Sequence, residues 1–273
     1  MKITLLGTGS PIPDPNRSGP ASLVQSGDAH LLIDAGRGVV TRLVGAGLFP
    51  FMLSGVLITH LHSDHIGDLN DIITTTWVMA GDDMDLKIFG PAGTEELVTA
   101  ALAMLALDIS YRVTHHESMT HGPTVSVTEI SAGDSFELGG LKIETGATDH
   151  RPVSPTLAYK ISDASQSVVM AGDGIPCEGL DKLLVGATAY VQSVIRDDLV
   201  RAIPVPRMQD ILDYHSTALQ AGETAAKAGI ETLILTHYVP APAPGNEHEF
   251  TEIAAQAFSG RIEAGPDLTA IEL

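Results

Sequence analysis

The segment THLHSDHIGD, residues 59–68, narrows the possible folds more than any other part of the chain. It follows an apolar run and places His60, His62, Asp64 and His65 within six positions. Imidazole and carboxylate groups suit zinc, manganese or iron. One ion cannot easily take all four groups, because the adjacent Asp64 and His65 point differently from the alternating His60 and His62. The spacing therefore predicts two neighbouring ions, with His60 and His62 on one and Asp64 and His65 on the other.

Four apolar runs of the chain end in a side chain that can bind a metal ion. They are VLITH ending at His60, KIETGATDH ending at His150, VVMAGD ending at Asp173 and TLILTH ending at His237. Short runs rich in aliphatic and β-branched residues are typical of strands. In enzymes built on sheets, sites gather where strands end and loops leave the rigid scaffold. The four endings therefore indicate one metal site at the ends of several strands.

The wider pattern predicts an α/β fold with two mixed sheets covered by helices. The predicted strands are 2–7, 30–36, 55–60, 86–90, 125–130, 141–150, 156–161, 167–173, 189–195 and 232–237. The predicted helices are 38–48, 68–80, 94–107, 178–186, 216–229 and 249–258. No repeat or long linker divides the chain. We therefore expect residues 1–273 to form a single metallo-hydrolase domain.

The HxHxDH pattern resembles the signature of the metallo-β-lactamase superfamily. The order of the other motifs is similar to that of the ribonuclease Z and arylsulfatase-like branch. These motifs are LGTGSPIPDPNRSGPAS near the N-terminus, GPAG at 90–93, YHST at 214–217 and LTHY at 235–238. The resemblance covers nearly the whole chain. It implies a four-layered αβ/βα sandwich with two divalent metal ions at one edge.

The resemblance implies seven metal ligands, three for the first ion, three for the second and one that bridges them. In that order they are His60, His62 and His150, then Asp64, His65 and His237, then Asp173. We expect both ions to be Zn²⁺, with Mn²⁺ and Fe²⁺ as alternatives. Two such ions make water nucleophilic near neutral pH and hold the oxygens of the group under attack.

Three further residues have implied roles around the ligands. Asp34 matches a position that supports a ligand without binding metal. Asp64 can orient the attacking water or take its proton, and His215, if protonated, can donate to the leaving oxygen. The alternative for His215 is that it only caps or packs beneath the following helix. Gly174 departs from the branch, which usually has a hydroxyl residue there, and this places a supporting hydrogen bond in doubt.

Other chemically reactive residues receive weaker interpretations. His115, His116 and His121 can be read as a third metal site, but a polar loop is favoured. Trp77 lies on a helical pattern, which favours core packing over a wall for substrate. Cys177 is the only cysteine, so the chain has no intrachain disulfide and no thiolate zinc site.

Charge and chain length around the motifs point to a small substrate. The formal net charge is -19, which disfavours phosphate backbones. Only 22 residues separate His150 from Asp173, too few for the tRNA-gripping arm typical of bacterial ribonuclease Z. The expected substrate is a small-molecule ester, either a phosphodiester or an arylsulfate type, with nucleic acid disfavoured. Alternatives are a tRNA 3′-processing ribonuclease, a lactonase and, last, a non-catalytic metal-binding protein.

The ends and apolar runs of the chain bear on its location. The segment MKITLLGTGS lacks the long apolar region of a secretory leader. No run approaches the roughly 20 apolar residues that a membrane span needs. We therefore expect a cytoplasmic protein without a membrane partner, and leave a homodimer open.

Overall fold

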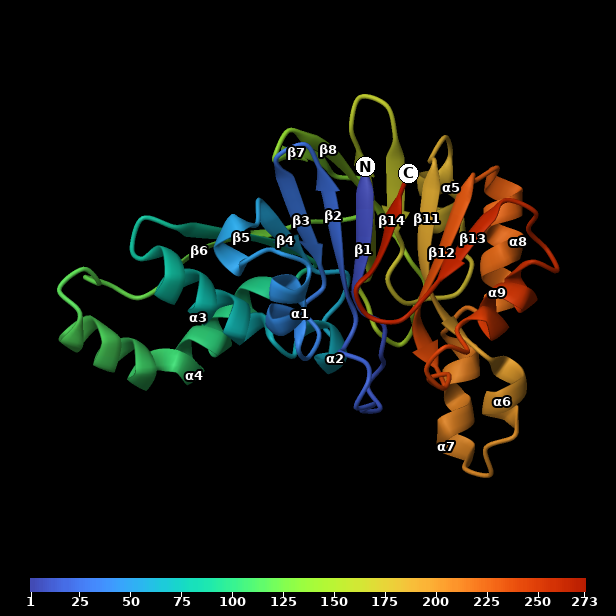
Figure 1. Cartoon of the computed structure of the whole chain (residues 1–273), viewed down its shortest axis with the longest axis horizontal. Coiled ribbons are helices and arrows are strands. Elements are labelled where there is room, and N and C mark those ends of the chain that lie inside the picture. The colour runs from blue at the N-terminus through green and yellow to red at the C-terminus, as the bar shows by residue number, and fades with distance from the viewer.

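Two seven-stranded sheets face each other across a buried apolar layer in the computed structural model, which describes residues 1–273 (Figure 1). The first sheet has the order β14 (Thr269–Glu272), β1 (Lys2–Gly7), β2 (Ala21–Ser26), β3 (Ala29–Ile33), β4 (Gly55–Leu57), β5 (Asp85–Gly90) and β6 (Thr124–Glu129). The second has the order β13 (Arg261–Ala264), β12 (Thr232–Val239), β11 (Ala189–Ile195), β10 (Ser167–Met170), β9 (Leu157–Ser162), β8 (Leu141–Ala147) and β7 (Ser135–Leu138). In each sheet antiparallel strands give way to parallel ones, so both sheets are mixed as expected.

Helices cover the outer face of each sheet. On the first sheet they are α1 (Val39–Gly45), α3 (Leu69–Ala80) and α4 (Thr94–His115), and on the second α5 (Glu178–Leu184), α8 (Ala218–Ala228) and α9 (His248–Ala254). Short helices occupy the connections, namely η1 (Pro50–Met52), α2 (Ser63–Ile66), α6 (Asp197–Arg201), α7 (Pro206–Gln209) and η2 (Asp210–Asp213). Figure 1 shows α6 and α7 projecting at the end of the molecule where α2 lies.

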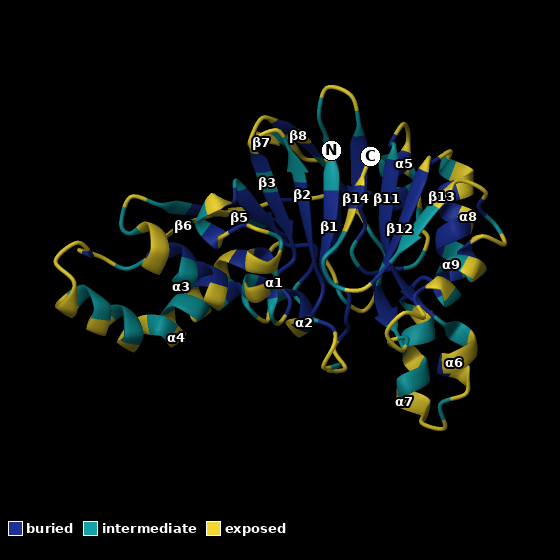
Figure 2. Ribbon diagram, in the orientation of Figure 1, coloured by how far each residue is buried: buried dark blue, intermediate teal, exposed yellow.

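The four layers follow from strands that are apolar on both faces. On β3, Leu31 and Ile33 point into the layer between the sheets, whereas Leu32 faces the helices outside. This alternation is the period of two that a strand imposes on its side chains. Figure 2 shows the resulting buried sheets beneath helices that are exposed on one side. The predicted αβ/βα sandwich is therefore confirmed.

Several element boundaries differ from those predicted. The strands β2, β7, β13 and β14 lie outside every predicted strand. The strands β7, β13 and β14 have four residues each, and all three lie at an edge of their sheet. Short, half-exposed edge strands carry little periodicity, because only one side packs. Helix α4 also runs eight residues beyond its predicted end at residue 107.

Helix α4 qualifies the expectation about membrane spans. Its 22 residues are enough, by length and apolar composition alone, to cross a membrane. Little of this helix is buried, and Figure 2 shows α4 coloured mainly as intermediate and exposed. One such helix is weak evidence of a span, and the exposed Met104, Leu107 and Tyr111 remain an apolar surface of the protein.

A buried ion pair joins the loop after β1 to the loop after β12. The Arg17 guanidinium lies 2.5 Å from a Glu247 carboxylate oxygen, donates to the Thr8 hydroxyl at 2.8 Å and sits over the Tyr238 ring. We expect Arg17→Met to lower the free energy of unfolding by about 3–5 kcal/mol, because it leaves the buried Glu247 charge unpaired. Urea unfolding measures this.

The matched control for this prediction is Lys182→Met, which removes the cation of an exposed ion pair with Glu178. This variant should not change the urea midpoint measurably, because exposed pairs are screened by solvent. An unchanged midpoint for Arg17→Met as well would show that the buried pair does not stabilise the join between the two loops.

Candidate metal centre

Three predicted ligands lie the same number of residues after the strands that precede them in the chain. His60, His150 and Asp173 each stand three residues after the last residue of β4, β8 and β10. Each strand therefore ends earlier than predicted, and a short loop carries the ligand. Because β4 belongs to one sheet and β8 and β10 to the other, the ligands meet where the two sheets come together.

His237 reaches the same place through a bulge. It lies within β12 and has a φ of 50°, which is rare for a residue with a side chain. The pairing with β11 shifts here, since Ser193 faces Thr236 but Ile195 faces Val239. The extra residue on β12 bends the strand locally, as bulges beside functional sites do.

The remaining ligands come from the loop after β4 and from α2. His62 precedes the helix, and Asp64 and His65 lie within its four residues. His62 is half-buried, and the other six predicted ligands are buried. The chain turns into α2 after His62. The side chains of Asp64 and His65 therefore face other residues than those of His60 and His62 do.

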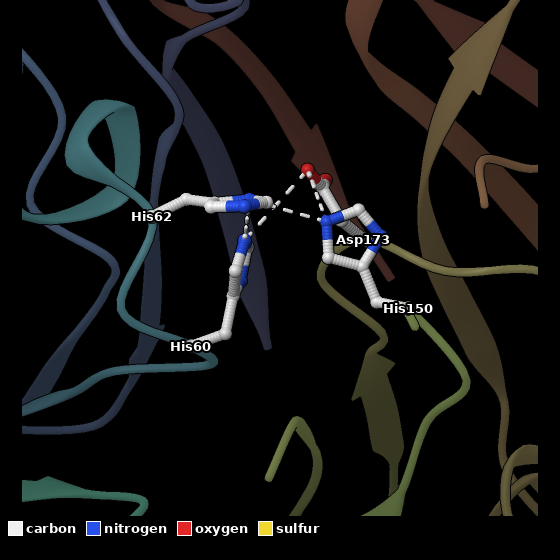
Figure 3. Close-up of side chains that lie close together, drawn as sticks. All are labelled: His60, His62, His150 and Asp173. Carbon is white, nitrogen blue, oxygen red and sulfur yellow. Dashed lines mark hydrogen bonds and ion pairs between the residues drawn. The ribbon is translucent and has the colours of Figure 1, made fainter. Parts of the chain in front are cut away.

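The seven side chains form two adjoining groups that could each hold a metal ion. The first contains His60, His62, His150 and Asp173, and Figure 3 shows these four converging from different segments. The second contains Asp64, His65 and His237, and the ligand atoms of each group all lie within 4.8 Å of one another. His62 Nδ1 is 3.0 Å from His60 Nε2 and 3.2 Å from His150 Nε2.

Asp173 lies between the two groups. Its Oδ2 is 3.9 Å from His60 Nε2 and 4.0 Å from His150 Nε2 on one side. On the other side it is 3.2 Å from His65 Nε2 and 3.4 Å from His237 Nε2. Its second oxygen, Oδ1, is buried without a hydrogen-bond partner. This is the position expected of a carboxylate that serves both groups.

The donor set fits two divalent ions. With metal–nitrogen bonds of about 2.0–2.1 Å and tetrahedral angles, two ligand atoms on one ion lie roughly 3.3 Å apart. The separations of 3.0–4.0 Å within the groups lie around that value. An unpartnered carboxylate oxygen buried among imidazoles is also costly unless a cation or donor meets it.

The electrostatics of the cluster point the same way. Burial lowers the pKa of His60 well below its ordinary value, and His65 lowers it further. Burial also opposes ionisation of Asp173, yet His237 and His65 hold its pKa well below the usual range. For His65, burial acts downward, but Asp173 and Asp34 raise its pKa well above the ordinary value. The buried Asp173 carboxylate is thus stabilised in its charged form by the positive charge that its histidine neighbours can carry.

Asp34 supports His65 and does not join either group. One oxygen lies 2.7 Å from His65 Nδ1, and the carboxylate also accepts from the Thr59 backbone N–H at 2.8 Å. The ring nitrogen that faces Asp173 is therefore Nε2. A carboxylate on the far ring nitrogen sets the tautomer and the orientation of a metal-binding histidine.

We expect Asp34→Asn to weaken metal binding about 10–100-fold, the usual effect of removing such a support. Competition with a chromophoric chelator measures the affinity directly, without an activity assay. Asp163→Asn is the matched control, because Asp163 caps a distant turn through Ser165 and Gln166. Equal affinities in the two variants would contradict the role of Asp34.

His215 lies beside the cluster, at the start of α8. Thr217 caps this helix through Gln220, and Gly229 ends it in the left-handed conformation. Burial lowers the pKa of His215 to about 4, although Asp173 acts to raise it. The ring is therefore neutral at pH 7, so the condition that His215 be protonated is not met in the resting site. A neutral imidazole still offers one N–H as a hydrogen-bond donor.

The structure explains the glycine after Asp173. Gly174 has a φ of 147°, and a Cβ at this position would lie 2.9 Å from the Asp149 carbonyl oxygen. The carbonyl of Gly174 accepts from the Ser216 hydroxyl at 2.8 Å. A hydroxyl residue therefore does not fit this backbone, and Ser216 ties the loop to α8.

An open cleft of about 350 Å³ leads to the cluster. Its floor includes His62, Asp64, Asp173, His215 and His237. Its walls come from the loop after β1, from the segment of α7 and η2 with the residues that follow it, and from the end of β12; they include Ile12, Met208, Ile211, Tyr214 and Val239. The cleft thus combines a polar floor with largely apolar walls, a common design for sites that bind organic groups.

Other candidates from the sequence lie outside the site. His115, His116 and His121 are exposed and belong to neither metal group, so the third metal site is not supported. Trp77 is buried against the core, as favoured. Sequence reasoning missed Arg207, which lines the cleft, because the segment 196–213 has no motif or regular periodicity.

A buried cluster of seven His and Asp side chains at the meeting edge of two helix-covered sheets defines a metal-dependent hydrolase. The family model described as anti-Pycsar protein Apyc1 matches residues 1–199. A protein named ribonuclease Z from Mycobacterium bovis is 50% identical over 100% of this chain and 98% of its own length. The ribonuclease Z of Mycobacterium avium is 49% identical with the same coverage.

Solved structures agree on the fold. The metallo-β-lactamase fold protein YhfI from Bacillus subtilis has a TM-score of 0.76 at 22% identity, covering 99% of this chain and 98% of its own. The short form of human tRNase Z has a TM-score of 0.73 at 21% identity, covering 100% and 99%. The chain belongs to the metallo-β-lactamase superfamily, in its ribonuclease Z branch.

The expectation of a small-molecule ester substrate without nucleic acid is wrong. Relatives about half identical over their whole length are named as ribonucleases. The net charge of -19 was a misleading guide to the substrate because it sums the charges of the whole surface. A bound substrate responds mainly to charges near the cleft, within about a Debye length. The short segment between His150 and Asp173 likewise excludes only a long tRNA-gripping arm at this position. It does not exclude other ways of holding RNA.

Proposed function

We propose that the protein is a ribonuclease Z, an endoribonuclease that hydrolyses a phosphodiester bond at the 3′ side of tRNA precursors. The full-length identity of 50% to proteins of that name carries this proposal. The cleft supports it, because it is open to solvent and its floor is the candidate metal centre.

We propose that the seven clustered side chains hold two divalent ions, with Asp173 as the shared ligand. Zinc is the first choice of metal, since all seven donors are imidazole nitrogens or carboxylate oxygens. When bound, two such ions supply a nucleophile from water near neutral pH and stabilise charge on the phosphoryl oxygens. Because the two sheets share the ligands, we also propose that residues 1–273 act as one domain. We propose separately that the protein acts in the cytoplasm.

The chain's own residues have distinct tasks in this scheme. Asp64 borders the cleft and can orient the attacking water and accept its proton. The neutral His215 can donate an N–H to the leaving ribose oxygen or to a phosphoryl oxygen. The apolar walls, including Ile12 and Tyr214, can exclude water around the flanking nucleosides.

The test uses metal-loaded enzyme and a precursor tRNA with a short 3′ trailer. We expect a single cut at the trailer junction, observed by gel electrophoresis, and no such cut with Asp64→Asn. A second substrate with the same trailer on an unstructured RNA should be cut poorly. Equal, position-independent cleavage of both RNAs would overturn the assignment while leaving the metal centre intact.

A further inference from the structure

The arginines of this acidic chain are almost all neutralised by carboxylates. Seven of the nine form ion pairs within 4.0 Å, namely Arg17, Arg42, Arg112, Arg151, Arg196, Arg201 and Arg261. The two that form none are Arg37 and Arg207. Both are exposed, and both belong to the surroundings of the cleft.

Arg207 stands in the wall that α7 and η2 contribute. It lines the cleft beside Met208 and Ile211, and His215 lies in the same cavity. No acceptor within the chain holds its guanidinium. The carboxylates of the neighbouring Asp210 and Asp213 are exposed and are not part of the cleft lining.

Arg37 stands on the other wall, behind the loop after β1. Its Nη2 lies 3.3 Å from the Ser10 carbonyl oxygen and 3.5 Å from that of Pro11. Ser10, Pro11 and Ile12 all line the cleft, so Arg37 lies directly behind the wall that this loop forms, although it is not part of the cleft lining. Its other guanidinium nitrogens bond to nothing in the chain.

We propose that Arg37 and Arg207 form a phosphate clamp that holds the RNA backbone on the two sides of the scissile phosphodiester. Guanidinium groups bind phosphate bidentately, and an unpaired guanidinium loses no internal ion pair when it does so. The clamp places the positive charge for RNA at the cleft itself, in a chain whose surface is otherwise acidic. This proposal rests on the proposed function, because it names the residues that grip that substrate.

The clamp is tested by the salt dependence of binding, which does not require cleavage. The probe is a fluorescent single-stranded hexanucleotide RNA whose methylene-phosphonate linkages keep the charge and resist hydrolysis. Anisotropy gives Kd for the metal-loaded enzyme over a series of salt concentrations. Each phosphate contact on a single strand contributes about -0.7 to the slope of log binding constant against log salt.

We expect Arg37→Gln and Arg207→Gln each to reduce the slope by about 0.7, and the double variant by about 1.4. Arg37→Lys and Arg207→Lys should keep the slope, since they keep the charge. Arg201→Gln is the matched control on the same projection, because Arg201 pairs with Asp197 and does not line the cleft.

An unchanged slope in the double variant would overturn the clamp, whatever the tRNA assay shows. If the slope changes as expected but precursor tRNA is not cut at its trailer, the clamp stands and the proposed function fails. If Arg37→Lys loses the slope as fully as Arg37→Gln, then Arg37 only supports the loop at Ser10 and Pro11, and the clamp as proposed is wrong.

Discussion

Protein stripped of metal by a strong chelator is expected to lose all detectable phosphodiester hydrolysis and to regain it with about two equivalents of a divalent ion. The chain has no thiolate or unpaired strong base at the cleft floor that could replace the metal's effect on water. Bulk water has a pKa of about 15.7, against about 7 beside zinc, so the expected loss spans many orders of magnitude. Elemental analysis and rate measurement on the same sample provide the test.

Ligand variants sharpen this expectation. His237→Asn should lower the metal content towards one equivalent, because His237 belongs to the smaller group with Asp64 and His65. The control is His115→Asn, at an exposed histidine at the end of α4, which should keep both ions and full activity. A fully active enzyme with one equivalent of metal would refute the dinuclear centre.

The second large effect is expected from His215→Ala. We expect both metal ions to stay bound, and kcat to fall about 10²–10³-fold, the usual cost of removing one preorganised hydrogen-bond donor. If the donor faces the leaving oxygen, a substrate with a poor leaving alcohol should lose more than one that releases nitrophenolate. Comparing the two substrates with one variant separates this role from a packing role, for which both rates fall equally.

The pH profile gives an independent check on His215. Its folded-state pKa of about 4 lies below the ordinary value of about 6.5, so the ring gains its proton only as the pH falls through about 4. The contribution of His215 to kcat should therefore not titrate between about pH 6 and pH 8. A rate that falls through this range in the wild type, and not in His215→Ala, would show that a protonated ring is required.

The sequence, read with its resemblance to a known family, predicted the layered fold and the set of side chains that cluster at the candidate site. Side chains at His60, His150 and Asp173 follow apolar runs, and a strand that ends at a sheet edge must present its next loop there. The caps of α8 were equally readable, because Thr217 and Gly229 act through their own backbone turns. Because such features depend on residues only a few positions apart, they can be predicted from local sequence patterns.

Tertiary structure decided what depends on distance and burial. Only the packing of the two sheets places Asp173 between His60 on one side and His237 on the other, and only the bulge in β12 brings His237 there. Burial likewise makes His215 neutral, because the cost of charging a ring depends on the solvent that its neighbours exclude. Only the tertiary structure shows that Arg37 and Arg207 form no ion pair, since composition counts charges but not their partners.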